Sequence, residues 1–138
     1  MLNVIIEAQG LRSATKLKKI LEDRQALVEF SKDKVEAQDK HVAKKTTETC
    51  FICSGEFSKS IKGNAGLIDL AKSYNATSIV IVSQTDKPFS LKEDLGGKLL
   101  HINFPEINET ENTVNEYGFQ IVATLVARNN QFIAGDLS

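Results

Sequence analysis

Short apolar runs alternate with amphipathic segments along the whole chain. Runs rich in β-branched residues predict strands, and apolar residues spaced three or four apart predict helices between them. The run Ser78–Val82 has no polar alternation, so we expect this strand to be covered on both faces, as in a parallel sheet. The five predicted strands are Asn3–Ile6, Ala26–Phe30, Thr49–Cys53, Thr77–Ser83 and Lys98–Phe104.

Helical spacing predicts four helices in the intervals. The last one carries apolar residues around more of its circumference than one sheet face covers. A loose tail, 131–138, is expected after a single domain spanning 1–130. The predicted helices are Ala14–Asp23, Asp33–Lys45, Leu67–Tyr74 and Thr110–Asn129.

Strands that alternate with helices predict an α/β fold with a five-stranded parallel sheet, doubly wound as a three-layer sandwich. For this length, the flavodoxin-like strand order 2-1-3-4-5 is expected. In such sheets, ligands bind at the carboxyl ends of strands one and three, where the winding reverses. Those ends are Ala8–Ser13 and Ser54–Ser60.

The polar residues of these two segments suit an anionic ligand. Backbone N–H groups, hydroxyls and a following helix together favour a phosphate. Arg12 is either a phosphate partner at this crevice or, as the favoured interpretation, an ordinary surface arginine. The candidate ligand contacts in these two segments are Ser54, Gly55, Glu56, Ser58, Ser60, Gly10 and Ser13.

Composition narrows the class of protein. The 138 residues are 41% hydrophobic and 25% charged, and their net charge of −1 gives no electrostatic basis for nucleic-acid binding. The sequence has no apolar run of about 18 residues, so no membrane span is predicted. The first residues, Met1–Val4, lack the basic region of a signal peptide, so a cytoplasmic location is expected.

The two cysteines form a C-x-x-C pattern, which invites a redox or zinc interpretation. Cys50 and Cys53 fall within a predicted strand, where an odd offset points their side chains to opposite faces. We therefore expect two core thiols, with no metal site and no cofactor.

The central stretch resembles a sugar isomerase (SIS) domain of the kind carried by RpiR-type transcriptional regulators. That family has a strand, a Ser-x-Ser-Gly-Glu-Thr loop, a helix, a strand ending in Thr, and a Ser-Pro-Leu turn leading to an Ala-Asp pair. The matching residues here are Ile52–Phe57, Leu67–Tyr74, Ile79–Ser83, Lys87–Phe89 and Asp94. The resemblance extends over about Met1 to Phe104.

The resemblance implies a phosphosugar-binding effector domain in which the Ser54–Glu56 loop contacts a sugar phosphate. It also implies a ligand contact for Ser83, which stands at the strand end where the family has Thr. The DNA-binding domain of the family is missing from this sequence, so no direct nucleic-acid binding is expected. Related SIS enzymes interconvert aldoses and ketoses, so an isomerase using Glu7 or Glu56 as a base is an alternative. No catalytic residue is assigned.

The family's Gly-x-Gly-x-Ser turn after strand one is replaced by Glu7, Gln9 and Leu11. A further alternative is therefore an SIS fold kept only for dimerisation, with Leu11 or Phe57 filling the crevice. Related domains dimerise, and the last predicted helix has surplus apolar surface. We therefore expect a homodimer that buries this helix or the flank of strand one.

Overall fold

The computed structural model describes residues 2–31, 48–61, 63–105, 107–108 and 113–137. For 107–108, 113–114 and 129–137 the description is limited to the backbone. The helix predicted at Asp33–Lys45 lies outside the described residues.

One mostly parallel sheet organises the described chain. Its strand order is β2-β1-β3-β4-β6-β5, in which β5 runs antiparallel to β6 and the other pairs are parallel. The α/β class is confirmed, as is the order 2-1-3-4 followed by β6. The strands are β1 (Asn3–Ile6), β2 (Leu27–Phe30), β3 (Thr49–Ser54), β4 (Ser78–Thr85), β5 (Ser90–Asp94) and β6 (Leu99–Pro105).

The count of five strands was wrong, because β5 adds a sixth at the edge. Its sequence, Ser90–Asp94, is polar except for Leu91, and most of it is exposed. An edge strand is held by backbone hydrogen bonds to one neighbour and needs no buried side-chain pattern. The central strands differ: every residue of β1 and β3 is buried, as are Ser78–Val82 of β4.

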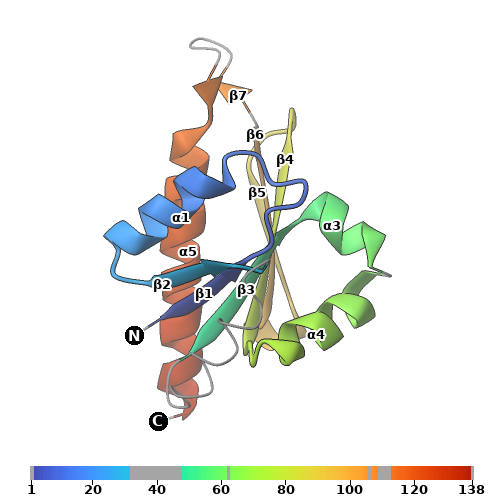
Figure 1. Cartoon of the computed structure of the whole chain (residues 1–138), viewed down its shortest axis with the longest axis vertical. Helices are drawn as coiled ribbons and strands as arrows, with labels where there is room; N and C mark the ends of the chain where they lie inside the picture. Colours follow the sequence, from blue (N-terminus) through green and yellow to red (C-terminus); the bar gives the residue numbers. More distant parts are fainter. Residues whose placement is uncertain (1, 32–47, 62, 106, 109–112, 138) are drawn as a thin grey trace.

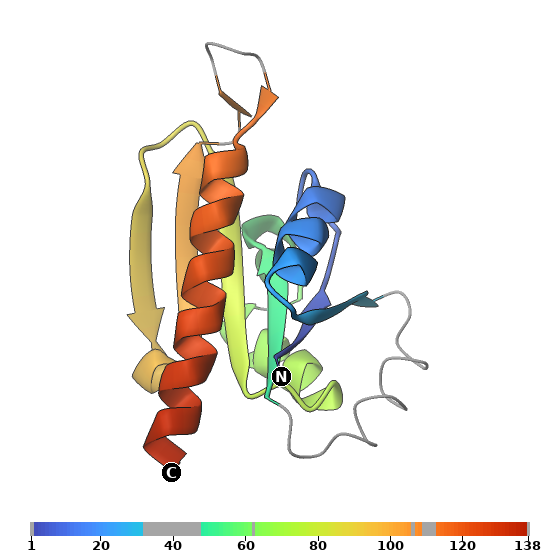
Figure 2. The same ribbon diagram turned by 90° about the vertical axis from the view of Figure 1, so that its left-hand side faces the viewer.

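Helices cover both faces of the sheet, which gives three layers (Figures 1 and 2). On one face α1 (Ala14–Asp23) and α5 (Glu116–Leu137) pack over a core that includes Leu17, Val122 and Val126. On the other face α3 (Gly55–Ser60) and α4 (Gly63–Ser73) cover a second core around Phe51 and Leu67. The helices that follow β1 and β3 therefore lie on opposite faces of the sheet.

Two short segments differ from the sequence prediction. The segment after Ser54, expected as a loop, forms the short helix α3. Before α5, a small hairpin of β7 (Ile107–Asn108) and β8 (Thr113–Val114) occupies residues assigned in part to the last helix. The 3₁₀ turn η2 (Leu95–Gly97) connects β5 to β6.

Helix α5 starts later and ends later than predicted. It runs from Glu116 to Leu137, so 131–137 continues the helix instead of forming a loose tail. The Asn115 side chain accepts a hydrogen bond from the Gly118 N–H at 2.9 Å, which satisfies one of the open donors of the first turn. None of the described helices combines the length and apolar character that a membrane-spanning segment needs.

Candidate functional site

The winding reverses at the carboxyl ends of β1 and β3. After β1 the chain enters α1 on one face of the sheet, and after β3 it enters α3 on the other (Figure 1). Ligands of doubly wound sheets bind in the crevice that such a divergence leaves. The observed topology therefore points to the two segments that the sequence selected.

Ser54 links these two segments. It is the last residue of β3 and only 2% exposed. Its Oγ donates to the Gln9 carbonyl at 2.8 Å and accepts from the Phe57 N–H at 3.0 Å. The hydroxyl therefore caps α3 and holds the turn after β1 against it.

Gly10 lies against the same hydroxyl. Its φ of +74° belongs to the left-handed region. A Cβ on Gly10 would lie 2.7 Å from Ser54 Oγ and 2.9 Å from Glu56 Oε2. The Glu56 carboxylate therefore approaches the backbone of the β1 turn, which a side chain at position 10 would prevent.

Gly55 makes a second close approach, toward β4. A Cβ at this position would lie 2.6 Å from Ser83 Oγ. Because Gly55 has no side chain, the Ser83 hydroxyl reaches the start of α3. The structure thus gathers five predicted residues from three strand ends, which we call the switch-point cluster: Gly10, Ser54, Gly55, Glu56 and Ser83.

The other three predicted residues lie outside these contacts. Ser58 is buried within α3. Ser60 is exposed, and its hydroxyl donates to the Phe57 carbonyl at 2.7 Å. Ser13 has a left-handed φ of 54° at the N-cap of α1, but its side chain makes no capping hydrogen bond.

A neighbouring polar group that the sequence did not predict surrounds Glu7. The Glu7 carboxylate accepts hydrogen bonds from the Ser31 hydroxyl and, at 3.1 Å, from the Gln9 N–H. The Tyr74 hydroxyl donates to the Ser31 carbonyl at 3.0 Å. Burial, followed by the charge of Glu7, raises the pKa of Tyr74. The Glu7 carboxylate thus fastens the end of β2 to the end of β1.

Leu11 and Phe57, the residues suspected of filling the crevice, are both buried. Leu11 belongs to the core beneath α1 and α5, and Phe57 to the core beneath α3 and α4. Each continues the packing of its own face.

The two cysteines are core thiols, as predicted. Cys50 packs on the α1–α5 face and Cys53 on the α3–α4 face, and both are buried and outside any disulfide. Burial, with smaller contributions from Glu7 and Cys50, raises the pKa of Cys53 to about 12. Across residues whose positions are described, no group of three His, Cys, Asp or Glu side chains is arranged to hold a metal ion.

The chain matches no protein-family model, no curated protein and no solved structure. The fold and the switch-point cluster are therefore the basis for a functional proposal, together with the residues that resemble an SIS domain.

Proposed function

We propose that this chain is a phosphosugar-binding domain of the sugar isomerase type, with the switch-point cluster as its ligand site. The observation that carries the proposal is the convergence of Gly10, Ser54, Gly55, Glu56 and Ser83 at the reversal between β1 and β3. The choice of a sugar phosphate over another small ligand rests on the Ser54–Glu56 resemblance.

The chemistry of the cluster divides between the two parts of such a ligand. The exposed Glu56 carboxylate accepts hydrogen bonds from sugar hydroxyls, and the Ser83 hydroxyl both donates and accepts. Ser54 uses its proton within the chain, so its role is to position the turn. Arg12 is exposed in the turn after β1 and supplies the positive charge that a phosphate requires.

Thermal shift measurements with hexose phosphates and amino-sugar phosphates test this proposal. A ligand at about 100 times its Kd stabilises the folded state by about 2.7 kcal/mol, which raises Tm measurably. Unphosphorylated sugars and inorganic phosphate should each give smaller shifts. No shift across the panel, with a well-folded sample, would overturn the proposal.

The matched variants are Glu56→Ala and Glu22→Ala. Both carboxylates are exposed, but Glu22 lies in the last turn of α1, whereas Glu56 lies in the first turn of α3 beside Gly10. Loss of a charged hydrogen bond should weaken binding at least about tenfold in Glu56→Ala. Equal affinities in the two variants would remove Glu56 from the site.

A second candidate function is homodimerisation through α5. The observation that favours it is Tyr117, a large aromatic side chain that is 75% exposed on this helix, with Ile121 half-buried at the following turn. An exposed apolar stripe of this kind marks an interaction surface. Dimerisation and ligand binding are compatible, because the stripe and the cluster involve different residues.

A further inference from the structure

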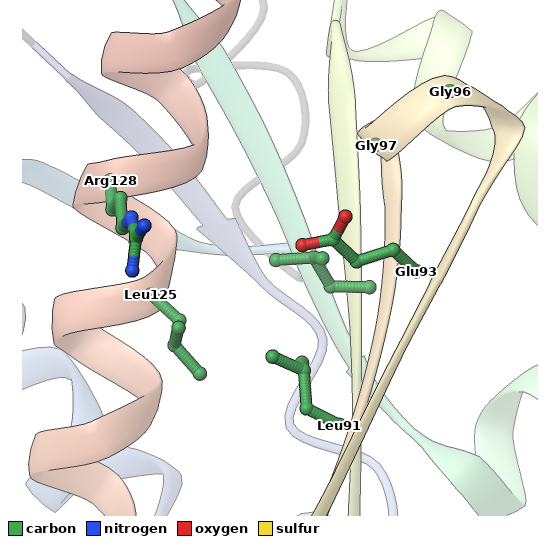
Figure 3. A pocket seen from close by; sticks show the side chains of 7 residues that line it. Leu91, Glu93, Gly96, Gly97, Leu125 and Arg128 are labelled. Atoms are coloured by element: carbon green, nitrogen blue, oxygen red, sulfur yellow. The ribbon is translucent and has the colours of Figure 1, made fainter.

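A cavity of about 290 Å³ lies at the sheet edge formed by β5, between that strand and α5 (Figure 3). Leu91 and Glu93 extend into it from β5, and Leu125 and Arg128 line it from α5. The Gly96–Gly97 turn closes one end. This turn precedes β6, so the cavity lies at the opposite end of the sheet from the switch-point cluster.

Strand register explains why the cavity exists. Leu91 pairs with Ile102 and Glu93 with Leu100, and paired residues point to the same face of a sheet. Leu100 and Ile102 belong to the core beneath α5, so Leu91 and Glu93 face the same side. Helix α5 packs against β3, β4 and β6, and β5 extends the sheet beyond it. The antiparallel strand β5 therefore leaves part of this sheet face uncovered beside the helix.

The floor and walls of this cavity are apolar. Leu100 is 2% exposed and forms the floor, whereas Leu91 is 40% exposed and Leu125 is half-buried. Three leucine side chains around a small volume favour an aliphatic group, since burial of apolar surface is the main favourable term in such a site.

Two opposite charges face each other across this apolar space. Glu93 comes from β5 and Arg128 from α5, and both are exposed (Figure 3). Among the described residues, neither side chain has an ion-pair or hydrogen-bond partner. A ligand that carries an ammonium group and a carboxylate would satisfy both charges and place its remaining atoms among the leucines.

We propose that this cavity binds a free α-amino acid with an aliphatic side chain. The ammonium group binds the Glu93 carboxylate, the carboxylate binds the Arg128 guanidinium, and the side chain packs against Leu91, Leu100 and Leu125. At about 30 Å³ for each water-sized group, the volume accommodates about ten non-hydrogen atoms, which is the size of leucine, isoleucine or methionine.

A second copy of the chain is a poorer occupant of this edge. Pairing through β5 would bring the exposed Lys92 close to its own copy, and a lysine in an edge strand opposes strand addition. Lys92 also alternates away from Leu91 and Glu93, so its charge does not enter the cavity.

Isothermal titration calorimetry with L-leucine tests the proposal. We expect a Kd of about 1 mM or tighter, and at least about tenfold weaker binding by Glu93→Gln and by Arg128→Gln. Lys92→Gln is the matched control, because it removes a charge from the other face of the same strand. All three side chains are exposed, so the variants should retain the Tm of the parent chain.

Two leucine analogues show which charged side chain binds the ammonium group of the ligand and which binds its carboxylate. 3-Methylbutylamine lacks the carboxylate, so Arg128→Gln should not weaken its binding further. 4-Methylpentanoate lacks the ammonium group, so Glu93→Gln should not weaken its binding. Glycine, which lacks the aliphatic group, should bind at least about tenfold more weakly than leucine.

Three results would overturn the amino-acid site. The first is no heat of binding with 10 mM leucine, on the order of ten times the expected Kd. The second is equal affinity in the parent chain and in both cavity variants. The third is an equal loss of affinity in Lys92→Gln, which would indicate a non-specific charge effect.

Discussion

Gly118 allows the closest approach between α5 and the sheet. A Cβ at this position would lie 2.2 Å from Cδ2 of Phe104 on β6, and Phe104 is fully buried against Phe119. Gly118→Ala should gain about 1 kcal/mol of helix propensity but lose more through overpacking. We expect a net loss of about 1–2 kcal/mol in the free energy of unfolding.

Urea denaturation followed by circular dichroism measures this loss. Thr124→Ala, an exposed position on the same helix, is the control and should change stability by about 0.5 kcal/mol or less. A Gly118→Ala variant as stable as the parent chain would show that α5 and Phe104 are farther apart than described.

Cys53 makes stability depend on alkaline pH. Its pKa rises from 9.0 to about 12 in the folded state, chiefly through burial. Between these values the unfolded chain has lost a proton that the folded chain keeps, so the free energy of unfolding falls as pH rises from about 9 toward 12. Below pH 9 the contribution is fully present.

Chemical denaturation from about pH 8 to about pH 11 tests this dependence, because the range starts below 9.0 and extends into the interval before about 12. Cys53→Ala should lower stability at every pH because it leaves a cavity, but its slope against pH should be shallower. An unchanged slope would assign the alkaline dependence to other groups.

At the level of elements, the apolar pattern predicted the strands and helices that contribute side chains to the core. All five parallel strands and α1 were found from their sequence because their apolar residues form short runs or recur at helical spacing. Strand β5 was missed because Lys92, Glu93 and Asp94 carry no apolar alternation. Helix α3 was missed because six residues containing Gly and Ser are typical of a turn, and Ser54 stabilises the helix through one cap.

An ion pair joins the two helices on one face of the sheet. Lys16 Nζ on α1 lies 2.6 Å from Glu116 Oε1 on α5, and the hydrogen bond and charge of Lys16 lower the pKa of Glu116. The contribution to stability is therefore present at neutral pH and is lost as pH falls through the lowered pKa of the folded state.

Lys16→Gln should raise the pKa of Glu116 toward its ordinary value, which a carboxyl-carbon NMR titration measures directly. Raising the salt concentration should produce the same direction of change in the parent chain, because the pair is exposed. Lys19→Gln, an exposed position on the same helix, should leave this titration unchanged. A titration of Glu116 that does not respond to Lys16→Gln would place the two helices differently.

At the scale of the molecule, the location of the candidate site was predicted mainly from the expected strand order. Parallel strands bring their carboxyl ends to one edge, so Gly10 and Ser54 were expected to lie near one another, whereas Ser83 was expected at the site from the resemblance alone. The individual contacts could not be predicted. The hydrogen bond from Ser54 to Gln9 and the approach of Glu56 to Gly10 depend on a short helix and a left-handed turn that leave no apolar pattern.

The assembly prediction also belongs to this scale. We expect a homodimer that covers Tyr117, so light scattering at tens of micromolar should give about twice the 15.2 kDa chain mass. Tyr117→Asp should yield monomers, because it places an unpaired charge in an apolar contact. Asn64→Asp, on the exposed start of α4 across the sheet, should leave the mass unchanged. A monomeric parent chain would contradict the dimer.

Strand order also determines when the sheet can be completed during synthesis. β1 lies between β2 and β3, so one of its edges stays open until the ribosome has made Thr49–Ser54. The open edge of β3 is then paired only when β4 has been made, and the open edge of β4 only when β6 has been made. Each of these parallel pairs requires closure of a long segment, whereas the antiparallel β5–β6 pair, joined by a short turn, is made last. We therefore expect the nascent chain to be most prone to aggregation between the emergence of β3 and that of β6.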